Sequence, residues 1–203
     1  MIGSFPELLE AAQSGDEDAF LALFRSLHPG LLRYLAALAG PAAEDIAADT
    51  WVGVVRNLGG FTGDEAGFAA WVFTIARARL RDEQRRAYRR PAPVDADQML
   101  AGHPDGLDVA AEAEESAGTA AALRLIASLP RDQAEAVLLR YVVGLDVAQT
   151  ALVLRKRPGA VRVASHRGLQ RLRGLLEEVT AATDNLPGGA VTAGDLRAIG
   201  EVT

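Results

Sequence analysis

The sequence contains no cysteine and only three histidines, His28, His103 and His166. Disulfide bonds and thiolate metal sites are therefore excluded, and three scattered histidines cannot build a histidine-based metal site by themselves. No apolar run approaches the roughly 18 residues that a membrane-spanning helix needs, and the amino terminus lacks the basic start and apolar segment of a secretion signal. We therefore predict a cytoplasmic protein without membrane insertion, metal or other cofactor.

Positive charge is also scarce, but it is concentrated. Asp and Glu number 27 against 21 Lys and Arg, which gives a formal net charge of -6 at pH 7. Two segments, Arg77–Arg90 and Leu154–Arg173, nevertheless hold seven cations each. A charged ligand responds to the field within about one Debye length, roughly 8 Å at physiological salt. Two basic patches on an acidic protein can therefore bind the phosphates of a nucleic acid.

The patterning predicts an all-α fold. Apolar residues make up 49% of the chain, aromatic residues only 5%, and no convincing strand alternation occurs. One helix is expected to begin at Ser14, in a capping-box spacing with Glu17, and to run to Leu27. Further helices are expected over 31–38, 43–57 and 65–90, and four more helical pieces after residue 118, separated near Pro130, Gly144 and Pro158.

The composition changes between the two halves of the chain. Residues 91–118 contain seven acidic residues, three prolines and no Lys or Arg, which is typical of a flexible linker, with helix expected only toward its end. We therefore predict two small helical domains, 1–90 and 119–178, joined by the acidic linker 91–118. A Gly/Ala/Thr-rich tail follows over 179–203.

The second basic segment has the pattern of a helix-turn-helix. Asp146 precedes Gln149 by the spacing of a helix cap, and Pro158 suits the first position of a second helix. The inner face of that helix is expected to carry Val161, Leu169 and Leu172, and the outer face Arg162, Ser165, His166, Arg167, Arg171 and Arg173. Because 154–174 contains no acidic residue, the helix suits the major groove of DNA, where Arg binds guanine and neighbouring cations bind phosphates.

The order of several motifs resembles a known family. The acidic-edged helix "AAEDIAADTWVGVV", the loop "FTGDEAGF", the basic helix "FAAWVFTIARARLRDEQRR", the linker, and the helix-turn-helix after "SLPRDQAEAVLLRY" follow one another. In this order the chain resembles the extracytoplasmic-function sigma factors of bacterial RNA polymerase over about residues 6–176. The resemblance implies a non-enzymatic subunit that binds core polymerase, recognises two elements of promoter DNA and helps to melt the downstream one. It implies no small-molecule substrate, and it allows for an anti-sigma factor as a further partner.

The resemblance also implies roles for individual residues. Core polymerase would be bound by an acidic helix edge, which suits a basic partner, through Asp45, Asp49, Thr50, Val54 and Val55. Downstream promoter DNA would be bound by Phe61, Asp64, Arg77, Arg81, Arg85 and Arg86, with Phe68 and Trp71 expected in the core. Upstream promoter DNA would be bound by Arg155, Lys156, Arg157, Arg162, Ser165, His166, Arg167 and Arg171.

Several departures from the family pattern keep alternatives open. Ala78 stands where the family commonly has a base-contacting Asn, and Arg157, Val163 and Ala164 replace polar family residues. These changes would suit a degenerate adaptor that binds polymerase or an anti-sigma factor without opening promoters. A stand-alone helix-turn-helix regulator would explain only the second basic segment. An enzyme would need the carboxylates 44, 45 and 49 as metal ligands, and the sequence has no nucleotide-binding loop or activated nucleophile.

Overall fold

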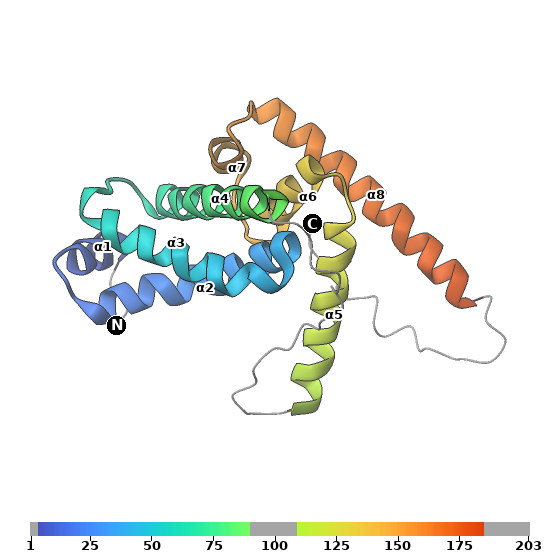
Figure 1. Cartoon of the computed structure of the whole chain (residues 1–203), viewed down its shortest axis with the longest axis horizontal. Coiled ribbons are helices and arrows are strands. Elements are labelled where there is room, and N and C mark those ends of the chain that lie inside the picture. Colours follow the sequence, from blue (N-terminus) through green and yellow to red (C-terminus); the bar gives the residue numbers. More distant parts are fainter. Residues whose placement is uncertain (1–3, 90–108, 185–203) are drawn as a thin grey trace.

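The computed structural model describes residues 4–89 and 109–184, and all regular elements within them are helices. The predicted all-α class is therefore confirmed. The N-terminal unit contains α1 (Phe5–Gln13), α2 (Glu17–Ala39), α3 (Ala43–Asn57) and α4 (Glu65–Arg89). The C-terminal unit contains α5 (Val109–Ala127), α6 (Arg131–Val137) with its π-helical continuation Leu138–Val142, α7 (Val147–Leu154) and α8 (Pro158–Asp184) (Figure 1). Among the described helices, none is long and apolar enough to cross a membrane.

The start of α2 differs from the sequence prediction. The predicted capping box at Ser14 and Glu17 is wrong, because Ser14 is instead the C-cap of α1. Gly15 then turns the chain with a φ of 96°, which glycine adopts without steric cost. Asp16 caps α2, since its carboxylate accepts a hydrogen bond of 2.9 Å from the backbone N–H of Ala19.

The two predicted helices over 14–27 and 31–38 are one continuous helix, α2, with Pro29 inside it. Proline removes one backbone hydrogen bond and normally bends or ends a helix. Here Leu23, Leu31 and Leu35 lie on one buried face that continues across Pro29. Burial of that face against α3 and α4 outweighs the local cost of the proline.

Aromatic side chains form much of the core of the N-terminal unit. Tyr34 of α2 and Phe73 of α4 are fully buried, and their rings meet edge to face at 5.6 Å. Phe68 is buried, as predicted, whereas Trp71 is half-buried. Trp51 donates a hydrogen bond of 3.1 Å from Nε1 to Nδ1 of His28. Partial burial lowers the pKa of His28, so the neutral imidazole, which can accept this bond, is favoured.

The C-terminal unit confirms the predicted helix-turn-helix boundaries. Asp146 and Gln149 form a capping box at the start of α7, with reciprocal bonds of 2.7 and 2.6 Å. Arg155 ends α7 in the left-handed conformation, with a φ of 53°, and α8 begins at Pro158. Helix also extends back to residue 109, into the end of the predicted linker. The rest of that linker and the end of the tail lie outside the described residues.

The two units pack directly on each other. In Figure 1, α7 lies beside α4, and α2 contacts both α5 and the continuation of α6. The sequence patterns carry no information on this arrangement. It determines which of the predicted functional side chains are exposed.

Candidate functional site

The outer face of α3 combines acidic and apolar side chains. Asp45 and Asp49 are exposed, and Val55 is 56% exposed. Val52, 47% exposed, lies on the same face, seven residues after Asp45 and three after Asp49. Sequence reasoning missed Val52, although this helical spacing identifies it.

Two other predicted contacts on α3 point the opposite way. Thr50 and Val54 are fully buried, and the hydroxyl of Thr50 donates a 2.7 Å hydrogen bond to the carbonyl of Ile46. The predicted direct contact of these two side chains with a partner is therefore contradicted in this arrangement. They hold α3 on the core, while the exposed face remains available.

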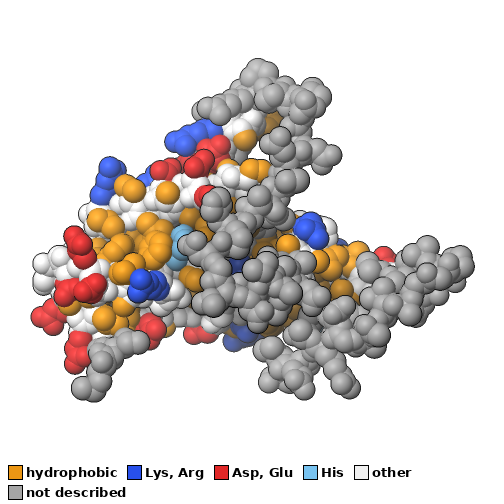
Figure 2. Space-filling view, turned by 90° about the horizontal axis from the view of Figure 1, so that it is seen from below, with side chains coloured by type: hydrophobic (Ala, Val, Ile, Leu, Met, Phe, Trp, Pro, Cys, Tyr) orange, Lys and Arg blue, Asp and Glu red, His pale blue; other side chains and the backbone are white. Residues whose placement is uncertain are grey.

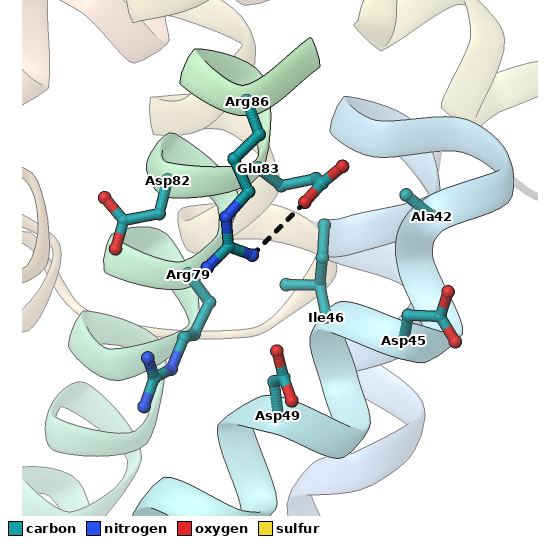
Figure 3. Close-up of a pocket in the computed structure, with 8 residues that line it drawn as sticks. All are labelled: Ala42, Asp45, Ile46, Asp49, Arg79, Asp82, Glu83 and Arg86. Carbon is teal, nitrogen blue, oxygen red and sulfur yellow. Dashed lines mark ion pairs between the residues drawn. The ribbon is translucent and has the colours of Figure 1, made fainter. Parts of the chain in front are cut away.

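A groove separates α3 from α4, and charges of both signs line it (Figure 3). Asp45 and Asp49 lie on one side, with Arg79 and Arg86 on the other. Arg86 also forms an ion pair of 3.6 Å with Glu83. No group of three or more His, Asp or Glu side chains in the described ranges is arranged to hold a metal ion. The acidic edge of α3 therefore has cations of its own molecule nearby.

The helices α3 and α4 approach closely at one glycine. A Cβ atom at Gly53 would lie 3.2 Å from Cγ2 of Ile75 and 3.6 Å from a terminal nitrogen of Arg79. The missing side chain lets α4 lie against α3, and this packing places the arginines of α4 beside the acidic edge.

A second, more open groove adjoins the outer face of α3 at the end of the molecule that holds α1 and the start of α2. Phe20, Leu21 and Val55 supply apolar lining, and Asp16 and Glu17 lie at its edge. Seen from below, acidic side chains gather at this end beside apolar ones (Figure 2). The two features suit a partner that offers both cations and apolar side chains.

The loop before α4 is fixed by its own polar and aromatic contacts. Asp64 caps α4, because its carboxylate accepts a 2.7 Å hydrogen bond from the N–H of Gly67. Phe61 packs on Trp71, with ring centres 5.0 Å apart. Gln13 donates from its amide to the carbonyl of Phe61 at 2.8 Å. Both predicted contact residues of this loop therefore have structural roles, while Asp64 remains exposed.

The predicted DNA-binding cations of α4 divide into two groups. Arg81, Arg85 and Arg86 are exposed. Arg77 is instead only 5% exposed, and its guanidinium donates from Nε and Nη2 to one oxygen of Glu135 at 3.0 and 2.8 Å. The prediction that Arg77 is available to DNA is therefore contradicted in this arrangement.

Sequence reasoning missed the partner of Arg77, although a signal was present. Glu135 is a single carboxylate in the segment "AEAVLL", with apolar residues on both sides. It is 1% exposed. A carboxylate at such a position requires a charged or hydrogen-bonding partner. The pattern does not say which partner, because Arg77 lies 58 residues earlier.

The outer face of α8 differs in part from the prediction. Arg162, His166 and Arg167 are exposed as expected. Ser165 is only 4% exposed, and its hydroxyl donates to the carbonyl of Val161 at 2.8 Å, so its predicted DNA contact is contradicted. Val163 is 49% exposed among the cations. The inner face of α8 begins at Val161. It continues at helical spacings of four, seven and eleven residues with Ser165, Gly168 and Leu172.

Leu169 was predicted on the inner face but is 38% exposed. Gly168 occupies the inner position beside it, and a Cβ atom there would lie 2.7 Å from Cγ2 of Val137. The absence of a side chain allows α8 to cross close to α6. The prediction placed Leu169 on the inner face because apolar side chains usually face the core. It did not consider that a glycine can occupy an inner position where two helices cross closely.

The cations around the turn between α7 and α8 also fall into two groups, those that are exposed and those that are bonded to α6. Arg155 and Arg157 are exposed. Lys156 forms an ion pair with Asp132 of α6, and the hydrogen bond from Lys156 lowers the pKa of that carboxyl group. Arg171 donates to the side-chain oxygen of Gln133 at 3.1 Å. Lys156 and Arg171 thus connect the helix-turn-helix to α6.

Comparisons with known families match both units of the chain. A model of "Sigma-70 region 2" matches residues 23–90, and a model of "Sigma-70, region 4" matches residues 119–172. The first range holds most of α2 and all of α3 and α4, and the second holds the end of α5, all of α6 and α7 and the first part of α8. They include the first basic segment, the second one up to residue 172, and the acidic edge of α3.

Named relatives cover most of the chain. The ECF RNA polymerase sigma factor ShbA of Streptomyces griseus is 39% identical over 180 residues, which are 84% of this chain and 94% of ShbA. The ECF RNA polymerase sigma factor BldN of Streptomyces coelicolor is 34% identical, over 85% of this chain and 66% of BldN. SigD of Mycobacterium tuberculosis is 31% identical, over 85% of this chain and 82% of SigD.

Solved structures share the fold. CnrH, in complex with the cytosolic domain of CnrY, matches with a TM-score of 0.62 and 24% identity, over 87% of this chain and 99% of CnrH. RpoE of Bartonella quintana, in complex with the anti-sigma factor NepR, matches with a TM-score of 0.61 and 21% identity, over 79% and 98%. With two matched sigma-70 regions and relatives above 30% identity, the chain belongs to the extracytoplasmic-function (ECF) sigma factors of the sigma-70 family.

Proposed function

We propose that this sigma factor binds core RNA polymerase through the outer face of α3 and recognises two promoter elements, with α4 assisting DNA melting and α8 reading the upstream element. The domain limits proposed for these tasks are 1–90 and 119–178, with 91–118 as the connecting linker. One observation carries the proposal: an exposed acidic and apolar face on α3 accompanies two exposed rows of arginines, on α4 and on α8.

Reversing the charge of the α3 edge tests the polymerase contact. The double variant Asp45→Lys with Asp49→Lys is expected to lose co-migration with bacterial core RNA polymerase on size exclusion, while the unaltered protein co-migrates. Both carboxylates are exposed, and like charges placed across an interface oppose docking. The measurement is the amount of this protein in the polymerase fraction.

A control variant carries the same change of net charge at another place. Glu177→Lys with Glu178→Lys alters two exposed carboxylates near the end of α8, and co-migration should be retained. Equal loss in both variants would indicate a dependence on overall charge, and binding by the α3 variant would remove α3 from the proposal. Failure of the unaltered protein to bind polymerase would favour the stand-alone regulator.

The second contact proposed is between α8 and the major groove. Arg162→Ala or Arg167→Ala is expected to weaken binding to the preferred upstream element by about 1–3 kcal/mol, the range for a bidentate contact between arginine and guanine. The preferred element is first selected from random duplexes with the polymerase complex, and affinities are then measured at one fixed salt concentration. Unchanged affinity and unchanged base preference in both variants would contradict the assignment.

Val163 is proposed to contribute an apolar contact on the same face. It lies exposed beside Arg162, and thymine presents a methyl group in the major groove that an apolar side chain can contact. In the family this position commonly holds a polar residue. In this protein Val163 would therefore favour DNA with a thymine at the base that it contacts.

An anti-sigma factor is a further proposed partner. The structures matched above are complexes of CnrH with the cytosolic domain of CnrY and of RpoE with the anti-sigma factor NepR. The adaptor alternative rests on Ala78, Val163 and Ala164. Ala78 is exposed on α4 without the amide that the family pattern places there. Polymerase binding without promoter opening would support that alternative.

A further inference from the structure

A cleft with a cationic edge lies between the two units of the chain. The helix α4 contributes Arg81, Arg85 and Tyr88 to its lining, and α6 contributes Arg131. All four of these residues are exposed. The cleft has a volume of about 590 Å³, which lies within the usual range for the sites of small molecules, roughly 300–1,000 Å³. A small ligand in this cleft would contact elements of both units.

The two carboxylates that line the cleft are already compensated by cations of the chain. Glu135 accepts hydrogen bonds from the buried guanidinium of Arg77 and from Nε of Arg131. Asp132 forms an ion pair with Lys156. Because two guanidinium groups face the single carboxylate of Glu135, one positive charge of this cluster is left over.

The cations of α4 at the edge of the cleft are available to a ligand. Among the described residues Arg81 forms no ion pair, and Arg85 pairs only with Asp82, at 3.5 Å between two exposed side chains. Such exposed pairs are weak, so a ligand can replace them. Arg81 and Arg85 lie on one side of α4, about 6 Å apart along the helix axis. Since arginine binds phosphate through charge-assisted hydrogen bonds, the two residues suit a ligand with more than one phosphate group.

Tyr88 adds an aromatic surface beside these cations. It follows Arg81 by seven residues, or about two helical turns, and so lies on the same side of α4. It is 93% exposed, so it contributes little to the core. The base of a nucleotide stacks on an aromatic ring of this kind. The cleft therefore offers groups that fit both parts of a nucleotide, its phosphates and its base.

We propose that this cleft binds a nucleoside di- or triphosphate, with the phosphate groups on Arg81, Arg85 and Arg131 and the base on the ring of Tyr88. The site depends on the packing of α6 beside α4, and it does not depend on the proposed contacts with polymerase or promoter DNA. Mg²⁺ prefers carboxylate ligands, and both carboxylates of the lining are paired with cations of the chain. The site therefore favours the nucleotide without its magnesium ion.

Isothermal titration calorimetry of the full chain with ATP and with GTP, in a buffer of low salt that contains EDTA, measures the binding. One molecule of nucleotide should bind per chain. Saturating Mg²⁺ should weaken the binding, because the metal ion removes charge from the phosphates. Tripolyphosphate, which lacks the base, should bind more weakly than ATP. If neither ATP, GTP nor tripolyphosphate binds at millimolar concentration, the proposal is overturned.

Two substitutions on opposite walls test the place of the site. Arg85→Gln on α4 and Arg131→Gln on α6 should each weaken ATP binding by about tenfold or more, since each removes a hydrogen bond between charged groups. Arg86→Gln is the matched control. Arg86 is the next residue of α4, is exposed and pairs at 3.6 Å with Glu83, but it lines the groove toward α3.

The control variant should bind ATP as tightly as the unaltered protein. Equal weakening by Arg85→Gln and Arg86→Gln would show a general attraction between a basic helix and a polyanion, and it would overturn the proposed site. Unchanged affinity in Arg131→Gln would overturn the contribution of α6. Helical circular dichroism of each variant verifies that the fold is retained.

Substitution of Tyr88 separates the base from the phosphates. Tyr88→Ala should weaken ATP binding by about tenfold, within the range for a base stacked on an aromatic side chain, and should leave tripolyphosphate binding unchanged. Tyr88→Phe keeps the ring and should retain the affinity for ATP. Equal weakening of both ligands by Tyr88→Ala, or no weakening of either, would overturn the assignment of the base to this ring.

Discussion

Replacing Phe73 by alanine is expected to lower the free energy of unfolding by about 3–5 kcal/mol, the range for removing a fully buried phenylalanine. The side chain has no exposed surface, and its ring meets that of Tyr34 edge to face at 5.6 Å and an interplanar angle of 83°. The substitution removes apolar burial and this aromatic contact and leaves a cavity between α2 and α4. Urea-induced unfolding followed by circular dichroism measures the change.

The control is an aromatic residue on the same helix. Tyr88 is 93% exposed, so Tyr88→Ala should change stability by less than about 0.5 kcal/mol. A small effect of Phe73→Ala, similar to that of the control, would show that α2 and α4 do not pack through this ring. A large effect confined to Phe73 would establish that α4, which carries the arginines, is held on α2 through this ring.

A second large effect is expected at the crossing of α6 and α8. Gly168→Ala should destabilise the C-terminal unit by about 1–3 kcal/mol, the usual cost of inserting atoms into a packed site. The new Cβ would lie 2.7 Å from Cγ2 of Val137 and 3.4 Å from the carbonyl oxygen of Gln133. Because the backbone of α6 cannot give way easily, α8 must shift, and upstream DNA binding should weaken as well. Thermal unfolding and DNA titration measure the two effects.

Another glycine of α8 provides the matched comparison. A Cβ at Gly174 meets no atom of the described residues within 4 Å, so Gly174→Ala should be neutral or should stabilise the helix by up to about 1 kcal/mol through helix propensity. The sign of the effect should thus differ between two identical substitutions in one helix. Stabilisation by both would mean that α8 and α6 are further apart than the structure shows.

In the arrangement of the two units, some of the proposed contact residues are exposed and one is buried. The acidic face of α3 and the cations Arg162 and Arg167 of α8 are exposed while the units are docked. Arg77 alone among the proposed cations of α4 is buried. In this arrangement the surfaces proposed for polymerase and upstream DNA are therefore accessible, whereas Arg77 is not.

Local chemistry is sufficient to predict the fold class and many element boundaries. Asp146 with Gln149 and Pro158 mark the helix-turn-helix correctly, because caps and prolines act on the backbone within a few residues. The boundary at Ser14 failed because a nearby alternative, Asp16 after a glycine turn, caps the same helix. Two candidate surfaces, the acidic face of α3 and the cations of α8, follow in outline from helical periodicity.

The sequence by itself determined the local features of each helix. These are which segments are helical, where acidic and basic residues are concentrated, and which face of a helix is apolar and which is polar. Only the tertiary structure decided which charges remain available. Arg77 and Arg81 share one basic helix, yet Glu135, far along the chain, buries the first and leaves the second exposed. The reason is physical, since the state of a charge depends on the solvent and partners around it, and those are supplied by elements that meet only when the chain has folded.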